Sequence, residues 1–151
     1  MSKSESGVPS GIRAAVRRRS EFSDVDSSGR YHYGTVIRLL EAAEVELLSN
    51  LGLLDEIYTS MPRAHLEIDY ASTLHFMDEV EVTIEVSDLG RTSVTFGFMV
   101  RRAEEVCARG KLVTVFVDPD GNPAPWPEKA REQFGGKSRT VSGFRPGRQP
   151  E

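Results

Sequence analysis

The chain has 151 residues, of which 38% are hydrophobic and 28% charged, and its formal net charge is -4. This length suits one domain, and the composition is that of a globular protein rather than a disordered or fibrous chain. The charge excludes a strong global attraction to nucleic acid or to an anionic membrane. No apolar run approaches the ~20 residues of a membrane span, and residues 1–10 lack the apolar centre of a signal peptide. We therefore expect a cytoplasmic protein.

The first elements are a strand and a long helix. Residues 1–10 are rich in serine and glycine and are predicted to be disordered. Apolar and polar residues alternate from Ile12, which predicts a first strand, and a turn-forming cluster follows at residues 24–29. Between residues 34 and 50 apolar side chains recur at helical spacing, and Gly52 can close this helix. This is the only long helix that the sequence predicts.

After Pro62 the hydrophobic period becomes two, which predicts four further strands that each bury one face. Turn-forming residues at 88–91 and 102–105 join three of these strands as hairpins. A short helix is predicted from Pro127 to about Phe134, and residues 135–151 are predicted to be a disordered tail. The element order predicts an α+β domain over residues 11–134, with one long central helix against a twisted antiparallel five-stranded sheet.

Composition also limits the chemistry. Cys107 is the only cysteine, which excludes an intrachain disulfide, and its apolar neighbours favour a buried side chain over a nucleophile. The basic run Arg17–Arg19 is followed by acidic residues, so we interpret it as a solvated strand end rather than a nucleic-acid site. His75 and Asp78 have no partner at metal-ligand spacing, and we expect neither a metal nor a cofactor.

Five segments carry a further signal through their order and spacing. They are FSDVDSSG at residues 22–29, LLEAAE at 39–44, Asp78 before a strand, LGRTSVTF at 89–96, and ARG at 108–110 with the exit of the last strand. With these segments the chain resembles the 4-hydroxybenzoyl-CoA thioesterase family of hotdog proteins, including its acyl-CoA thioesterase branch. The resemblance covers about residues 12–134. The hotdog fold that it implies agrees with the predicted element order.

The resemblance implies hydrolysis of an acyl-CoA thioester to free acid and coenzyme A. It implies that Asp26 is the catalytic carboxylate, and that an amide at the helix start, at Tyr33, polarises the thioester carbonyl. A carboxylate can attack the carbonyl or activate water, and the first amides of a helix carry partial positive charge. Gly34 would allow close approach of a substrate because it has no side chain. From spacing alone Asp26 could also be a turn residue, and Asp24 could be the working acid instead.

Other candidates depend on the same resemblance. Glu41 lies on the helix flank, where a second hotdog thioesterase branch carries its catalytic carboxylate; a structural hydrogen-bond acceptor is the alternative. The hairpin residues Arg91, Thr92 and Ser93 are implied to contact the nucleotide end of coenzyme A, since arginine suits phosphate geometry. A solvated turn arginine is the alternative for Arg91.

The resemblance also implies an assembly. It predicts a homodimer whose sheets join edge to edge, with two sites at the interface, and further pairing would give a homotetramer. Two alternative functions remain open, namely a hotdog thioesterase acting on acyl-carrier-protein thioesters and a non-catalytic acyl-binding protein. In one branch of the family a histidine occupies the place of Tyr33, so His32, one residue earlier, receives no family role.

Overall fold

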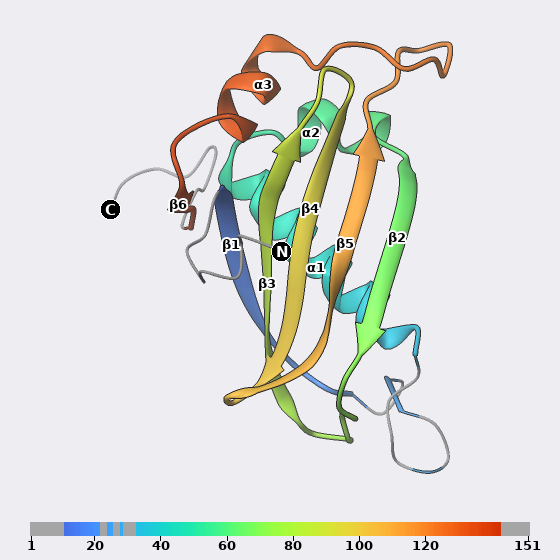
Figure 1. Cartoon of the computed structure of the whole chain (residues 1–151), viewed down its shortest axis with the longest axis vertical. Helices are drawn as coiled ribbons and strands as arrows, with labels where there is room; N and C mark the ends of the chain where they lie inside the picture. Colours follow the sequence, from blue (N-terminus) through green and yellow to red (C-terminus); the bar gives the residue numbers. More distant parts are fainter. Residues whose placement is uncertain (1–10, 22–23, 26–27, 29–32, 143–151) are drawn as a thin grey trace, which may run out of the picture.

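The computed structural model describes residues 11–21, 24–25, 28 and 33–142 (Figure 1). In chain order its elements are β1 (Ile12–Arg19), α1 (Thr35–Asn50), α2 (Leu54–Ile57), the 3-10 turn η3 (Tyr58–Ser60), β2 (Arg63–Tyr70), β3 (Glu79–Leu89), β4 (Ser93–Arg102), β5 (Glu105–Val115), α3 (Glu128–Phe134) and β6 (Arg139–Thr140). The predicted long helix and the short helix before residue 135 are confirmed. In these described ranges no helix is long and apolar enough to cross a membrane.

The sheet has six strands in the order β2-β5-β4-β3-β1-β6. The five long strands are antiparallel to their neighbours, whereas β6 runs parallel to β1. The sheet curves around α1, which lies behind it in Figure 1. The α+β prediction is therefore confirmed, but the count of five strands was wrong. The sixth strand lies within the segment that we predicted as a disordered tail, and its two residues are too few to produce a hydrophobic period.

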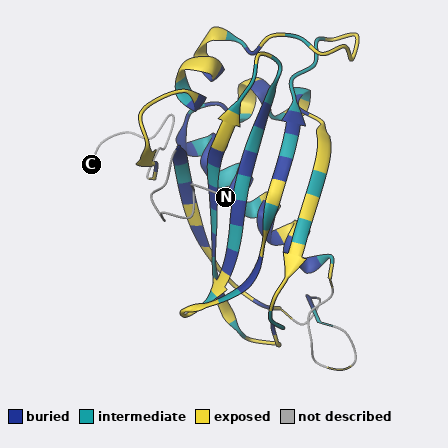
Figure 2. Cartoon of the chain, viewed as in Figure 1, coloured by how far each residue is buried: buried dark blue, intermediate teal, exposed yellow. Residues whose placement is uncertain are grey.

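The core lies between α1 and the central strands. The helix packs against β1, β3 and β4, and its apolar stripe is buried at Val36, Leu39, Leu40, Ala43 and Leu47. Every second residue of β3 and β4 faces this layer, so burial alternates along both strands (Figure 2). At the upper end of Figure 1, α3 and the segment before it add an aromatic cluster. In it the rings of Trp126 and Phe134 pack edge to face, with their centroids 5.3 Å apart. The two layers thus form one hydrophobic core.

β2 departs from the prediction that each strand has one buried face. None of its eight residues is buried. Leu66 and Ile68 are half-buried, and Tyr70 is 46% exposed. The physical reason is its place at the edge of the sheet, because α1 packs mainly against β1, β3 and β4 and meets β2 through the Arg63–Glu44 pair. The period of two identified the strand correctly, but a sequence pattern does not show which strand a single helix leaves uncovered.

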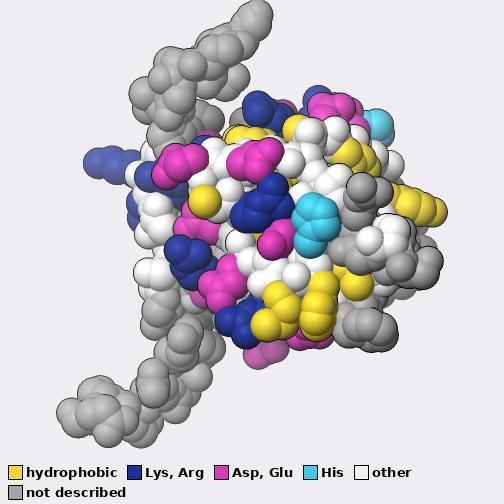
Figure 3. All heavy atoms as spheres, turned by 90° about the horizontal axis from the view of Figure 1, so that it is seen from below, with side chains coloured by type: hydrophobic (Ala, Val, Ile, Leu, Met, Phe, Trp, Pro, Cys, Tyr) yellow, Lys and Arg dark blue, Asp and Glu magenta, His cyan; other side chains and the backbone are white. Residues whose placement is uncertain are grey.

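The opposite edge, at β1, is partly covered. β6 pairs with Ile12 and Arg13, and the amide of Val141 donates to the Arg13 carbonyl at 2.7 Å. The rest of β1 ends in the exposed run Arg17–Arg19, of which Arg19 pairs with Glu79 at 2.7 Å. Seen from the lower end of the molecule, acidic and basic side chains are interspersed (Figure 3). This arrangement agrees with the interpretation of the run as a solvated strand end.

Candidate active site

The first candidate feature is the N-terminal end of α1. Gly34 is its N-cap residue, with φ -74° and ψ -13°, and among the described residues no side chain caps this end. The first helical turn contains no acidic residue. The leading amides of a helix have no acceptor within the helix, and they carry partial positive charge. This end of α1 can therefore stabilise a developing oxyanion. A Cβ built on Gly34 meets no atom within 4 Å, so the approach to its backbone is open.

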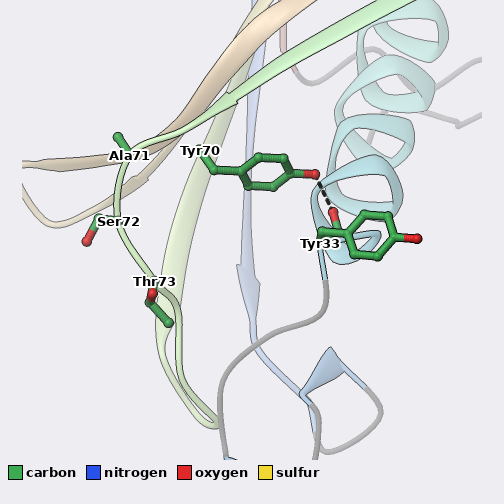
Figure 4. Close-up of a pocket in the computed structure, with 5 residues that line it drawn as sticks. All are labelled: Tyr33, Tyr70, Ala71, Ser72 and Thr73. Atoms are coloured by element: carbon green, nitrogen blue, oxygen red, sulfur yellow. Dashed lines mark hydrogen bonds between the residues drawn. The ribbon is translucent and has the colours of Figure 1, made fainter.

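Tyr33 and Tyr70 join this end of α1 to the end of β2. The Tyr70 hydroxyl donates to the Tyr33 carbonyl at 2.5 Å, while the Tyr33 ring points away from Tyr70 and is 80% exposed (Figure 4). Burial, with a smaller contribution from Tyr33, raises the pKa of Tyr70 above its ordinary value. The two tyrosines and the segment after β2 border an open hollow of about 260 Å³, lined by Tyr33, Tyr70, Ala71, Ser72 and Thr73.

Asp24, one of the two predicted acids, is buried and its carboxylate is hydrogen-bonded. Its side chain accepts two hydrogen bonds from the Arg38 guanidinium, at 3.0 and 2.6 Å, and a third from the Glu21 amide at 2.7 Å. Its carbonyl accepts from the Thr35 hydroxyl at 2.9 Å. With 3% exposure and both carboxylate oxygens hydrogen-bonded, Asp24 has a geometry that disfavours attack on a substrate. The choice between Asp24 and Asp26 as the working acid stays a prediction, and in the structure the Asp24 side chain anchors the segment before α1.

Asp26 and His32 lie outside the described residues. The catalytic role of Asp26 thus stays a prediction, as does the open role of His32. Among the described residues before and after them, Asp24 is hydrogen-bonded to Thr35 of α1 and Tyr33 to Tyr70 of β2.

Two of the three glutamates of α1, Glu41 and Glu44, lie on neighbouring turns and differ in environment. Glu41, the predicted second candidate, is exposed. Glu44 is 1% exposed; its Oε1 accepts a hydrogen bond from Arg63 of β2, and its Oε2 has no partner among the described residues. Burial raises the pKa of Glu44, and the charge of Arg63 opposes this only in part. Sequence reasoning missed this pair, although Glu44 stands four residues after Leu40, on the apolar stripe of the helix.

The predicted nucleotide-binding residues lie at the other end of the sheet. The Arg91 carbonyl accepts from Arg131 at 3.0 Å and from the Trp126 amide at 3.2 Å, which fixes the β3–β4 turn, while the Arg91 side chain is exposed. Tyr70 of β2 pairs with Ala108 of β5, and Ala108 pairs with Val100 of β4. Tyr70 and Val100 therefore lie at the same level of the sheet. Ser93 precedes Val100 by seven residues, which is about 24 Å of strand. Within one chain, Arg91, Thr92 and Ser93 therefore do not meet the start of α1.

Two further predictions concern metals and the single thiol. In the parts of the chain that the structure describes, no group of three or more His, Cys, Asp or Glu side chains could hold a metal ion. Cys107 is buried, as predicted, and burial raises the pKa of its thiol. A buried thiol that stays protonated is a poor nucleophile.

Comparison with known proteins matches this chain to one family. The model of the thioesterase-like superfamily matches residues 20–134. Among solved structures, a thioesterase from Thermus thermophilus complexed with coenzyme A and Zn is 30% identical over 80% of this chain and 90% of its own, with a TM-score of 0.72. A 1,4-dihydroxy-2-naphthoyl-CoA thioesterase from Synechocystis is 20% identical over 80% of this chain and 94% of its own, at TM-score 0.74. A predicted thioesterase from Bacillus stearothermophilus is 24% identical over 86% of this chain and 99% of its own, with a TM-score of 0.76.

Proposed function

Because the chain belongs to the thioesterase-like superfamily, we propose that it hydrolyses an acyl-CoA thioester to a free acid and coenzyme A. One observation supports this activity most directly. The N-terminal end of α1 has no side-chain cap among the described residues, and it lies beside the hollow lined by Tyr33 and Tyr70. A thioester carbonyl placed there would direct its oxygen at helix amides, which act most strongly on the charge that develops during attack. The coenzyme A bound by the Thermus thermophilus relative supports a coenzyme A substrate.

Asp26 is the proposed carboxylate. Asp24 is hydrogen-bonded to the first residue of α1, and two peptide units of about 3.8 Å keep the Asp26 Cα within about 8 Å of the Asp24 Cα. That reach supports an acid close to the carbonyl that the helix would polarise. Asp26 either attacks the carbonyl carbon, giving an acyl-enzyme anhydride that water then opens, or removes a proton from an attacking water. In both routes the carbon–sulfur bond breaks and coenzyme A leaves as a thiol.

We further propose that the enzyme is a homodimer in which the two β2 strands pair edge to edge. β2 is hydrogen-bonded to β5 on one side, and its apolar side chains are incompletely covered. A two-fold axis perpendicular to the sheet would reverse the direction of the partner's strands. The β3–β4 turn of the partner would then lie level with the start of α1. This assembly supports a nucleotide role for Arg91 that a single chain does not allow.

A panel of acyl-CoA substrates, with released thiol as the readout, tests the activity. Asp26→Asn should lower kcat about 100-fold or more while substrate binding persists, because the amide donors remain. Glu41→Gln is the matched control, since it also replaces one carboxylate by an amide, and it should keep most of the activity. Loss of turnover in Glu41→Gln with retention in Asp26→Asn would show that the helix carboxylate does the chemistry. Binding of acyl-CoA without turnover by the unmodified chain would favour the acyl-binding alternative.

A further inference from the structure

The first backbone amides of α1 have no acceptor in the described part of the chain. The amides of Gly34, Thr35 and Val36 donate to none of its carbonyls or side chains, whereas the Ile37 amide donates to the Gly34 carbonyl at 3.1 Å. Gly34 itself has helical dihedral angles, φ -74° and ψ -13°. Helical angles keep successive peptide groups nearly parallel, so the Gly34 and Thr35 amides point the same way, out of the N-terminal end of the helix. This end therefore presents a group of parallel donors.

Glycine makes the first of these donors accessible but holds it loosely. A Cβ built on Gly34 meets no atom within 4 Å, so the approach to its backbone is open. The same lack of a side chain lets the backbone rotate more freely, since glycine populates more of φ/ψ space than any other residue. The peptide group between Tyr33 and Gly34 therefore needs a contact from outside the helix to keep one orientation.

Tyr70 of β2 supplies that contact. Its hydroxyl oxygen lies 2.5 Å from the Tyr33 carbonyl oxygen (Figure 4), and it is the donor because a carbonyl oxygen carries no hydrogen. In a planar trans peptide group the C=O and N–H bonds point to opposite sides. A fixed Tyr33 carbonyl therefore also fixes the Gly34 N–H, which is directed away from Tyr70. The hydrogen bond to the carbonyl polarises the peptide group as well, and this strengthens its N–H as a donor.

We propose that Tyr70 is a positioning residue, which orients and polarises the Tyr33–Gly34 peptide group so that the Gly34 amide donates to the thioester oxygen. This inference rests on the proposed function, and it moves the polarising amide from Tyr33, where the resemblance implies it, to Gly34. Tyr70 lies 37 residues along the chain from Tyr33, so the sheet, and not the helix alone, sets the geometry of the donor. Tyr70 lies on the opposite side of the peptide group from this N–H, and it therefore acts through the peptide group rather than on the substrate oxygen.

The test combines Tyr70→Phe and Gly34→Pro in the full chain. Tyr70→Phe removes only the hydroxyl of a side chain that is 46% exposed, so the variant should fold. With the best acyl-CoA of the panel it should lower kcat about tenfold at nearly unchanged KM, because one neutral hydrogen bond contributes about that factor and acts here on the transition state. Gly34→Pro removes the N–H at a φ of -74° that proline adopts, and kcat should fall about 100-fold. In the double variant, Tyr70→Phe should cause no further loss.

A spectroscopic readout separates positioning from a purely structural role. The probe is the ketone analogue of the same acyl-CoA, in which a methylene group replaces the thioester sulfur and the carbonyl carries an isotopic label, so no turnover occurs. Hydrogen bonds from α1 should lower its carbonyl stretching frequency on binding to the unmodified chain, and Tyr70→Phe should reverse part of this shift. Tyr58→Phe is the matched control, because the Arg63 guanidinium lies over the Tyr58 ring, 5.8 Å from its centroid. This control should change neither kcat nor the carbonyl stretch.

The outcomes separate the inference from the proposed function. Unchanged kcat in Tyr70→Phe or full turnover in Gly34→Pro overturns the inference, as does a lower kcat in Tyr70→Phe with the carbonyl stretch of the unmodified chain. A loss from Tyr70→Phe that persists in the double variant also overturns it, because Tyr70 would then act on the substrate directly. If Gly34→Pro does not fold, kcat and the carbonyl stretch in Tyr70→Phe decide alone. If instead the proposed function fails, the unmodified chain turns over no acyl-CoA of the panel, or binds the ketone without lowering its stretch.

Discussion

Replacing Arg63 by methionine leaves Glu44 as a buried carboxylate without its ion-pair partner. Glu44 is 1% exposed and its second oxygen has no partner among the described residues, so the protein has two ways to respond. It can keep the charge, which commonly costs about 3–5 kcal/mol when one partner of a buried pair is removed. Alternatively, Glu44 takes up a proton. From an ordinary pKa of 4.5, protonation at pH 7 costs about 3.4 kcal/mol, at 1.36 kcal/mol per unit.

Protonation therefore limits the loss, and the limit depends on pH. At pH 5 the same protonation costs only about 0.7 kcal/mol. The sign agrees with the structure, because burial already raises the pKa of Glu44 in the folded protein. A carboxyl group with a raised folded pKa contributes stability that is fully present below its unfolded pKa and is lost as the pH rises through the folded value. We expect Arg63→Met to lose about 2–3 kcal/mol at pH 7 and less than about 1 kcal/mol at pH 5.

Urea unfolding at both pH values, at one fixed protein concentration, measures these free energies. Glu44→Gln is the matched control. It removes the buried charge and leaves the Arg63 side chain, which is 37% exposed and retains water. The control should therefore change stability by less than about 1 kcal/mol. The reasoning is refuted if Glu44→Gln is as destabilising as Arg63→Met, or if the loss in Arg63→Met does not depend on pH.

Two further predictions follow from the proposed assembly. Arg91→Ala should raise KM for acyl-CoA and leave kcat nearly unchanged, because a remote phosphate contact binds substrate and transition state equally; an equal loss with a short pantetheine thioester would remove the phosphate role. Ile68→Lys, which places a charge on the half-buried face of β2, should shift light scattering from dimer to monomer at micromolar concentration. A wild-type chain that is already monomeric at that concentration would contradict the edge-to-edge dimer.

The fold was predictable where a hydrophobic period runs through a whole element. The helix from Thr35 and the long strands β3 and β4 each bury one face. The spacing of their apolar side chains therefore shows directly which face lies against the core. β6 was missed because two residues hold no period, and its pairing depends on Arg13, more than a hundred residues earlier. The exposure of β2 was missed because it depends on where α1 crosses the sheet, which the pattern of β2 itself does not contain.

The sequence and the resemblance named candidate site residues, but not how they are arranged. The segment at residues 22–29 contains two acids before the predicted helix, yet only tertiary structure shows that Arg38 engages Asp24. The resemblance implied Tyr33, whereas its contact with Tyr70 joins residues 37 positions apart. Arg91 was predicted beside the same substrate, but strand length separates it from the helix start within one chain. Such distances follow from topology, which a motif does not encode.

The two edges of the sheet differ, and this difference limits how copies of the chain can associate. At β1 the strand β6 occupies Ile12 and Arg13, and three consecutive arginines end the strand, so a further strand would meet either an occupied edge or repelling charge. If copies of the chain associate only through β2, one two-fold pairing occupies this edge on both copies. No further copy can then add to the assembly. A chain shortened at residue 134, where the hydrophobic pattern ends, would lose β6 and reopen the first edge. Its sheets could then join end to end without closure, as in a fibre.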